Sequence, residues 1–349
     1  MSQFIRLTMD DIARLANVSK TTASLVLNGR SAEYRIAEST KERVLAIARE
    51  HHFQPSQSAK TLRSRKSGTL GLLVPELSNF AHASLAQALE PLCREAGYQL
   101  LVMSSNEQAA METAGIEHLL TRQVDGLIVV PCSSDATQYL KWSLRLPLVF
   151  VDRHIKDCPI PFVVTDAIDA VTSLVVQTTK GGSKEVVYLG GQADLSPSQD
   201  RLAGYRKGLE LSGVAEQEHW VWQRDYLRPS GYSMMAECYE RLGHYPDSLF
   251  TGSLTLLEGA LAYINEKQNG MPKHLMTFDD HNLLNCLPWG IQSVVQDSQQ
   301  LASESLARVL KLMQGEAVDS IWVPASLHQR LDTTRSEQAP PLNITCAAN

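Results

Sequence analysis

The sequence predicts an α/β protein in which a small all-helical head precedes two doubly wound lobes. Before Gly68, apolar residues recur at helical spacing, whereas after Thr69 short Val-, Ile- and Leu-rich runs alternate with amphipathic stretches. Unbroken apolar runs are typical of parallel strands that are buried on both faces. Because about eleven such runs occur, we expect them to form two sheets rather than one.

Composition and length are ordinary for a globular protein. The chain has 349 residues, of which 44% are hydrophobic and 20% charged. No stretch approaches the ~18 apolar residues of a membrane span, and the first seven residues lack the apolar core of a signal peptide. The six cysteines form no C-x-x-C motif and have no histidine at zinc-ligand spacing. We therefore expect a cytoplasmic protein without a membrane partner, metal or cofactor.

The first helix of the head is predicted to begin at Thr8. Thr8 and Asp11 have the spacing of an N-cap residue and its third-position partner. Ile12, Leu15 and Ala16 follow at helical spacing, so we expect them to share the buried face.

A tight turn and a second helix follow. Asn17 lies at the turn, where asparagine tolerates a left-handed backbone. Ser19 is the expected N-cap of a helix that runs to Leu27 and ends at Gly29. An ordinary helical hairpin is the plain alternative to a DNA-reading motif. The polar residues of the outer face that would reach base edges in a major groove are Lys20, Thr21 and Ser24.

Charge is distributed unevenly along the chain. Residues 1–68 contain 12 lysines and arginines against 6 acidic residues, a net charge of +6. The other 281 residues contain 20 against 32, a net charge of −12. A basic head on an acidic body is typical of a segment that neutralises nucleic-acid phosphates.

Four segments are expected along the chain. Residues 1–54 form the head, whose third helix spans about Ala37 to His51. Residues 55–68 form a basic linker, which is either plainly flexible or contains a short helix that orders on a polyanion. Residues 69–330 form the two lobes, and residues 331–349 a polar, disordered tail.

The expected strands and helices alternate through the body. The strands are Leu70–Val74, Gln99–Met103, Gly126–Val130, Leu148–Asp152, Phe162–Thr165, Val186–Gly190, Trp220–Gln223, Leu249–Thr251, Leu275–Phe278, Gln292–Val295 and Trp322–Ala325. The helices are 80–96, 107–122, 167–179, 198–212, 230–242, 254–268 and 298–314. Two such lobes leave a cleft at the carboxyl ends of their strands.

Catalysis is not indicated by the sequence. Acid and histidine are neighbours in Asp152-Arg153-His154 and in Asp279-Asp280-His281, but adjacent residues of an extended run point to opposite faces. No nucleophile elbow, P-loop or G-x-G-x-x-G motif is present. A sugar-binding protein without a DNA-binding role is the other alternative, and the basic head argues against it.

The segment Thr8–Gly29, the Pro55–Leu62 linker and the two α/β lobes resemble the lactose-repressor (LacI-type) family of bacterial transcription regulators. Within it, the segments 189–204 and 277–281 are most similar to the subgroup of sucrose-operon and fructose repressors. The resemblance implies periplasmic-binding-protein-like lobes and a homodimer on double-stranded operator DNA. It also implies a repressor of a sucrose or fructose utilisation operon, released when a sugar binds between the lobes. A fructose-phosphate-responsive global regulator of carbon metabolism is the alternative.

The resemblance also implies which residues contact DNA. Lys20 and Thr21 match base-reading positions, and Leu25 matches a further specificity position. Ser58, Ala59 and Leu62 match a hinge helix that enters the minor groove and wedges a leucine into it. The positions that match phosphate-contacting or positioning residues are Thr8, Ser19, Thr22 and Asn28.

The implied sugar site lies between the lobes. Its matching positions are Asn79, Phe80, Asp152, Ser196, Ser198, Arg201, Tyr226, Ser253, Asp279 and Gln296. Carboxylates, amides and an arginine suit the hydroxyls of a sugar, and aromatic rings cover its apolar face. Ser196, Ser198 and Arg201 together could hold a phosphate, so fructose, a fructose phosphate and sucrose all remain open as effectors.

Four positions depart from the family pattern. Asn17 replaces the usual glycine of the turn, and Ala37 replaces the usual Ser or Thr cap of the third helix, which costs about 1 kcal/mol. Ser253-Leu254 replaces an Asn-Asp pair and removes a carboxylate from the implied sugar site.

Overall fold

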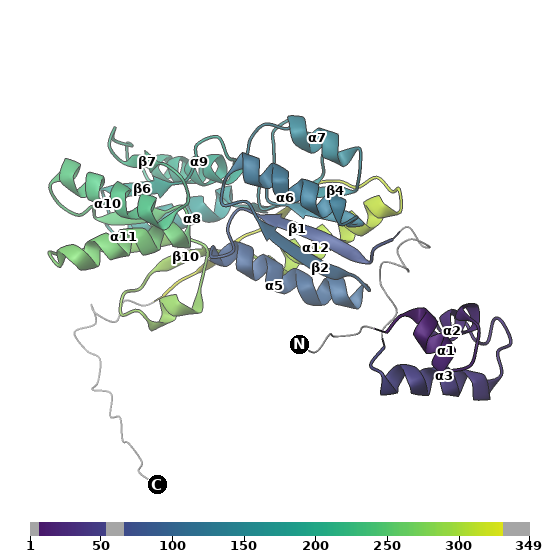
Figure 1. Cartoon of the computed structure of the whole chain (residues 1–349). Helices are drawn as coiled ribbons and strands as arrows, with labels where there is room; N and C mark the ends of the chain where they lie inside the picture. Colours follow the sequence, from purple (N-terminus) through teal and green to yellow (C-terminus); the bar gives the residue numbers. More distant parts are fainter. Residues whose placement is uncertain (1–6, 54–65, 331–349) are drawn as a thin grey trace, which may run out of the picture. The chain divides into compact units, whose positions relative to one another are not determined.

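The computed structural model describes residues 7–53 and 66–330, which belong to two compact units, Met1–Ser67 and Gly68–Asn349 (Figure 1). The predictions for Ser58, Ala59 and Leu62, and for the tail 331–349, lie outside the described residues. Each unit is described by itself below.

The first unit contains the helices α1 (Met9–Leu15), α2 (Lys20–Leu27) and α3 (Glu38–Glu50). Their shared core consists of Ile12, Ala13, Ala16, Ala23, Val26 and Val44, with partly buried neighbours around it. Leu15 was expected in this core, but it is 48% exposed. Ala13 is buried instead, because α1 turns the Ile12–Ala13–Ala16 edge toward α2 and α3.

The predicted ends of these helices are confirmed. The side chain of Thr8 accepts a hydrogen bond from the Asp11 N–H, and the Asp11 carboxylate accepts one from the Thr8 N–H. Ser19 caps α2 in the same way, through the N–H of Thr22. Asn17 has a left-handed φ of 49°, which the tight turn between α1 and α2 requires. Ala37 provides no side-chain cap to α3.

The second unit contains two sheets, as predicted, and each has six strands. The first sheet has the spatial order β11 (Ile321–Pro324), β5 (Phe162–Asp166), β4 (Leu148–Val151), β3 (Gly126–Val129), β1 (Thr69–Val74) and β2 (Gln99–Ser104). The second has the order β12 (Ser326–His328), β10 (Gln292–Val295), β9 (His274–Phe278), β8 (Ser248–Thr251), β6 (Val186–Gly190) and β7 (Val221–Gln223). All pairings are parallel except that of β12 with β10.

Helices cover both faces of each sheet (Figure 1). The first lobe has α5 (Phe80–Glu95), α6 (Ala109–Thr121), α7 (Thr137–Ser143) and α12 (Ser298–Met313). The second lobe has α8 (Ile168–Lys180), α9 (Ser196–Leu211), α10 (Arg228–Leu242), α11 (Leu254–Lys267) and the 3₁₀ turn η1 (Asn282–Cys286). Residues of β1 alternate between two cores: Leu70, Leu72 and Val74 pack with α5 and α12, whereas Leu73 packs with α6.

The chain passes between the two sheets three times. The passages are β5 to α8, β10 to α12 and β11 to β12. These three connecting segments join the lobes at the ends of strands. The contacts of residues beside them therefore depend on the angle between the lobes. Three short elements, α7, η1 and β12, were not predicted.

No helix within residues 7–53 and 66–330 has the length and apolar character of a membrane span. In the same residues, no three His, Cys, Asp or Glu side chains gather as metal ligands.

Candidate functional site

A polar cavity lies between the two lobes of the second unit. Its lining consists of Asn79, Ala81, His82, Asp152, Arg153, Pro197, Arg201, Tyr226, Ser253, Asp279 and Gln296. Its volume is about 20 Å³, which is room for about one water molecule. A ligand much larger than water therefore needs this cavity to widen.

Two carboxylates of the cavity directly follow strands, one in each lobe. Asp152 follows β4 and Asp279 follows β9, and both have left-handed backbones, with φ of 65° and 71°. A non-glycine residue in this region costs about 1–3 kcal/mol and is typical of ligand sites. With this backbone conformation, both aspartate side chains line the cavity, at the C-terminal ends of the strands.

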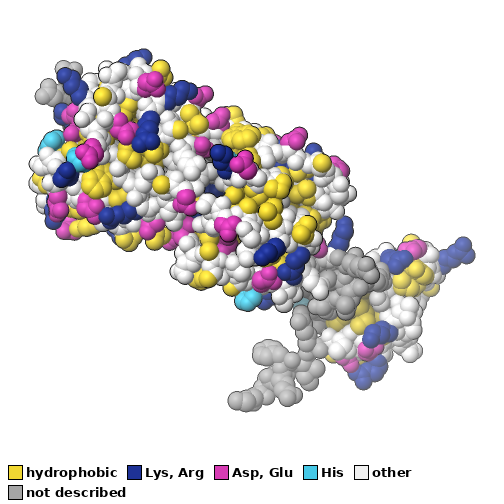
Figure 2. All heavy atoms as spheres, turned by 90° about the horizontal axis from the view of Figure 1, so that it is seen from above, with side chains coloured by type: hydrophobic (Ala, Val, Ile, Leu, Met, Phe, Trp, Pro, Cys, Tyr) yellow, Lys and Arg dark blue, Asp and Glu magenta, His cyan; other side chains and the backbone are white. Residues whose placement is uncertain are grey.

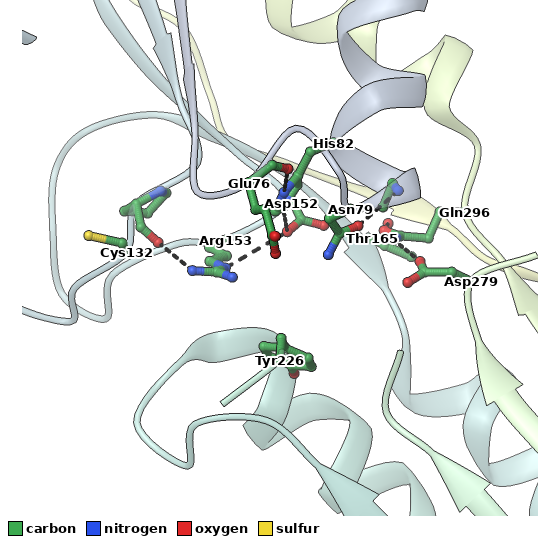
Figure 3. Close-up of polar contacts among 12 residues, drawn as sticks. Glu76, Asn79, His82, Cys132, Asp152, Arg153, Thr165, Tyr226, Asp279 and Gln296 are labelled. Atoms are coloured by element: carbon green, nitrogen blue, oxygen red, sulfur yellow. Dashed lines mark hydrogen bonds and ion pairs between the residues drawn. The ribbon is translucent and has the colours of Figure 1, made fainter. Parts of the chain in front are cut away.

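Asp152 contacts a histidine from α5 (Figure 3). The Asp152 carboxylate lies 3.8 Å from Nε2 of His82, whose Nδ1 lies 3.0 Å from the carbonyl oxygen of Glu76. Burial alone would raise the pKa of Asp152, but contact with His82 and the charges of two nearby arginines lower it below its ordinary value. Asp152 is therefore a charged hydrogen-bond acceptor at neutral pH.

Asp279 is tied to the passages between the lobes (Figure 3). The amide of Gln296, just after β10, donates to Asp279 at 2.6 Å. The hydroxyl of Thr165, near the end of β5, donates to the other end of that amide at 2.6 Å. Burial raises the pKa of Asp279, although the charge of Arg201 opposes the rise. A ligand that binds Asp279 is thus linked by hydrogen bonds, through Gln296 and Thr165, to two of the three segments that connect the lobes.

Arg201 extends from α9 into the cavity. Its side chain is buried, its Nη1 donates to the Gly252 carbonyl at 2.5 Å, and its guanidinium lies 3.7 Å above the Phe278 ring. Tyr226 lies beside it, with the guanidinium 5.6 Å from the ring centre. These contacts hold the arginine in one orientation, facing both carboxylates.

Seven of the ten predicted sugar-site residues line the cavity: Asn79, Asp152, Arg201, Tyr226, Ser253, Asp279 and Gln296. Asn79 and Ser253 are also the N-caps of α5 and α11. Helix N-termini present unpaired N–H groups, so both caps place further donors at the edge of the cavity.

The other three predicted residues do not line it. Phe80 packs edge-on against His281, with ring centres 4.3 Å apart. The Ser196 hydroxyl accepts from the backbone N–H of His154 at 2.9 Å. The Ser198 hydroxyl is 2.7 Å from that of Tyr226. In this structure Arg201 lines the cavity, whereas the hydroxyls of Ser196 and Ser198 bond His154 and Tyr226 beside it.

Sequence reasoning missed His82 and Arg153. Regular alternation along an extended run would place Asp152 and Arg153 on opposite faces. The left-handed φ of Asp152 breaks that alternation, and both residues line the cavity. At the neighbouring pair Asp279 and Asp280 the side chains do point to different sides. Asp279 lines the cavity, whereas Asp280 accepts hydrogen bonds from Ser293 and Arg330 and does not line it.

The predicted DNA-reading residues lie on and around α2 of the first unit. Lys20 and Thr21 are exposed, and the Lys20 ammonium forms an ion pair with Asp10 at 2.8 Å. Ser19 and Thr22 bond each other at the start of the helix, and the Asn28 amide donates to the Ser24 carbonyl at 2.6 Å at its end. Leu25 is half-buried.

Charged side chains of both signs lie on both units. On the face seen in Figure 2, each unit displays Lys and Arg together with Asp and Glu. The described residues 7–53 contain seven Lys and Arg against six Asp and Glu, so most of the predicted basic excess of residues 1–68 lies outside them.

Comparison with known proteins identifies the family. Residues 8–56 match the model of bacterial regulatory proteins of the lacI family, and residues 67–270 match the model of periplasmic binding proteins and the sugar-binding domain of the LacI family. The chain is 44% identical to the sucrose operon repressor of Klebsiella pneumoniae, over 93% of this chain and 98% of that protein. It is 33% identical to the fructose operon regulatory protein of Vibrio cholerae, over 87% and 93%.

Solved structures agree with this assignment. The Cra transcriptional dual regulator of Pseudomonas putida, solved with fructose 1-phosphate, is 27% identical and has a TM-score of 0.69 over 76% of this chain and 99% of that one. A lac repressor dimer bound to operator shares the fold at 22% identity, with a TM-score of 0.79 over 94% and 99%. The chain belongs to the LacI family of bacterial regulatory proteins.

Proposed function

We propose that the protein is a sequence-specific repressor of a sucrose-utilisation operon. In this proposal a sugar, such as fructose or a fructose phosphate, binds between the lobes and releases the protein from its operator. The observation that carries it is the cavity, where both lobes supply hydrogen-bonding side chains to one small space. The 44% identity to a sucrose operon repressor over nearly the whole chain supports the operon.

A global regulator of carbon metabolism is the second candidate. The 34% identity to the catabolite repressor/activator of Escherichia coli, over 86% of this chain, favours it. The two candidates share the mechanism and differ in the number of operators bound. We propose no catalytic role for either.

We assign residues 1–54 to DNA binding, 55–68 to the hinge and linker, and 69–330 to sugar binding and dimerisation. Lys20 and Thr21 would read base edges, with Leu25 as a further specificity residue. The ion pair of Lys20 with Asp10 is exposed, so exchanging it for a guanine edge costs little. The roles of Ser58, Ala59 and Leu62 rest on the family resemblance alone.

Release is proposed to begin with movement of the lobes. Contacts between the two lobes include His154 with Ser196, Phe80 with His281, and the Ser134 hydroxyl with Asp194 at 2.9 Å. In this proposal a sugar that widens the cavity of about 20 Å³ strains or breaks such contacts. In a homodimer, the new lobe angle changes the spacing of the two linkers on operator DNA. A coupling of about 1–3 kcal/mol between the two sites is typical.

A thermal-shift panel tests whether the cavity binds sugars. We expect fructose, fructose 1-phosphate or fructose 6-phosphate to raise the unfolding temperature, because a ligand at about 100 times its Kd adds about 2.7 kcal/mol. Adding sucrose tests whether the disaccharide itself binds. Ribose is the control sugar and should leave the unfolding temperature unchanged. If neither fructose, its phosphates nor sucrose shifts unfolding at millimolar concentration, the proposed effector class is wrong.

A further inference from the structure

The exposed ion pair of Lys20 with Asp10 joins the first turns of two helices. The Lys20 ammonium, at the first residue of α2, donates at 2.8 Å to the carboxylate of Asp10, in the first turn of α1. The other ion pairs that the structure describes within residues 7–53 each join residues three apart: Arg14 with Asp11, Arg30 with Glu33, and Lys41 with Glu38. Those pairs are local, whereas Lys20 with Asp10 is a contact between helices.

The place of Lys20 does not favour its own helix. A cation at the N-terminus of a helix faces the positive end of the helix dipole, which is unfavourable. The first turn of α2 contains no acidic residue that would compensate for this charge. The compensating carboxylate comes from α1 instead, and it belongs to Asp10.

Asp10 differs from its neighbour Asp11, whose carboxylate serves α1 itself. Asp11 accepts a hydrogen bond from the Thr8 N–H at 2.9 Å and forms an ion pair with Arg14 at 2.6 Å. The side chain of Asp10 is 65% exposed, and its carboxylate contacts Lys20. Asp10 therefore sets the surroundings of Lys20, while the cap of α1 depends on Asp11.

The core of the head fixes the spacing of the two helices. Ile12 of α1 packs in one core with Ala23 and Val26 of α2, and all three side chains are buried. The first turns of α1 and α2 therefore keep their separation when the surface of the head meets another molecule. An acceptor that reaches the Lys20 ammonium must also approach the Asp10 carboxylate.

The two kinds of acceptor that DNA offers to Lys20 differ in charge. A phosphate is an anion, and like charges about 4 Å apart in water repel each other by an amount worth about fivefold in affinity. The O6 and N7 atoms of a guanine edge are uncharged acceptors, so the carboxylate does not repel them in this way. A cost that falls on the wrong partner is a source of specificity. Asp10 thus makes a phosphate a poorer partner for Lys20 than a base edge.

We infer that Asp10 is a specificity-determining residue, which directs Lys20 toward an uncharged base edge and away from phosphate. The inference rests on the proposed function, in which Lys20 reads bases. It adds a residue of α1 that the sequence did not indicate as a DNA contact, and its effect is to weaken binding to the wrong DNA.

Fluorescence anisotropy with two DNA duplexes tests the inference. One duplex is selected from random-sequence DNA by the unaltered full-length protein, and the other has the same bases in shuffled order. Asp10→Asn removes the charge at nearly constant size. We expect it to lower the Kd for the shuffled duplex by about fivefold and the Kd for the selected duplex by less, so that the preference for the selected duplex falls by about threefold or more.

Salt dependence gives a second readout of Asp10→Asn. In this variant Lys20 is released from its carboxylate and can contact one more phosphate of the shuffled duplex. The slope of log Kd against log salt for that duplex should therefore steepen by up to about 0.9.

The matched control is Glu38→Gln, which removes the same charge from the same head. Glu38 is 68% exposed and pairs with Lys41, so the preference for the selected duplex should change by less than about twofold. Asp10→Glu keeps a carboxylate and should keep most of the preference. In Lys20→Ala, a further change of Asp10 to Asn should leave the preference where it is, because the residue that Asp10 directs is absent.

The outcomes separate this inference from the proposed function. The inference is wrong if Asp10→Asn keeps the full preference, if Glu38→Gln reduces it equally, or if the effect of Asp10→Asn persists in Lys20→Ala. Sequence-specific DNA binding stands in each of these cases. If selection enriches no sequence, the inference and the DNA-reading part of the proposed function fail together.

Discussion

Replacing Arg201 with alanine is expected to abolish the response to sugar and to leave operator binding intact. The substitution removes the donor to Gly252 and the cation that faces Asp279 and Asp152. Removing one partner of a buried, hydrogen-bonded charged contact with a ligand costs about 2–5 kcal/mol of binding free energy. The Kd for the effector should therefore rise by about 100-fold or more, as measured by isothermal titration.

The controls for this prediction come from the same position and the same helix. Arg201→Lys retains the charge without the fork and should show an intermediate loss. Arg206→Ala removes an arginine of α9 that is 55% exposed and pairs with Glu216, so it should bind sugar normally. Circular dichroism and operator binding of each variant establish that it is folded. Unchanged sugar affinity in Arg201→Ala would show that the cavity is not the effector site.

Replacing Gly259 with alanine is expected to destabilise the second unit strongly. Gly259 of α11 lies against α10, where a Cβ would fall 2.1 Å from the Arg228 carbonyl oxygen and 2.6 Å from the Tyr232 nitrogen. Both obstacles are backbone atoms, so the helices must separate. Overpacking of this kind costs about 3 kcal/mol, which lowers the Tm by about 6–12 °C in a body of this size.

Glu258→Ala is the matched control for Gly259→Ala. Glu258 precedes Gly259 on α11 and is exposed, so its removal should change the free energy of unfolding by less than about 0.5 kcal/mol. Calorimetry of both variants gives the comparison. Equal melting temperatures would mean that α10 and α11 are not in close contact at this glycine.

The sequence predicted the two sheets because their strands are buried on both faces and therefore form unbroken apolar runs. The three missed elements have no such signal. The helix α7 has 7 residues and no side-chain cap. The strand β12 has 3 residues, none of them fully buried, and its pairing is antiparallel. Such short elements depend on tertiary contacts, which the spacing of apolar residues along the sequence does not reveal.

The errors at individual residues have a similar origin. Leu15 and Ala13 both fit a helical pattern, and only the position of the neighbouring helices decides which is buried. Arg153 was not predicted, and the left-handed backbone at Asp152 breaks the alternation by which an extended run would have separated these two side chains. The cavity residues that were predicted came from the family resemblance, since loop ends carry no periodic signal.

The central claim is that sugar bound between the lobes weakens operator binding by the first unit. Its most direct test is the operator Kd, measured at one fixed salt concentration, with and without saturating fructose or fructose 1-phosphate. A coupling of about 1–3 kcal/mol predicts an increase of about 5–150-fold, and no increase in Arg201→Ala. If titration shows the sugar bound while the operator Kd is unchanged, the two sites are not coupled and the account is wrong.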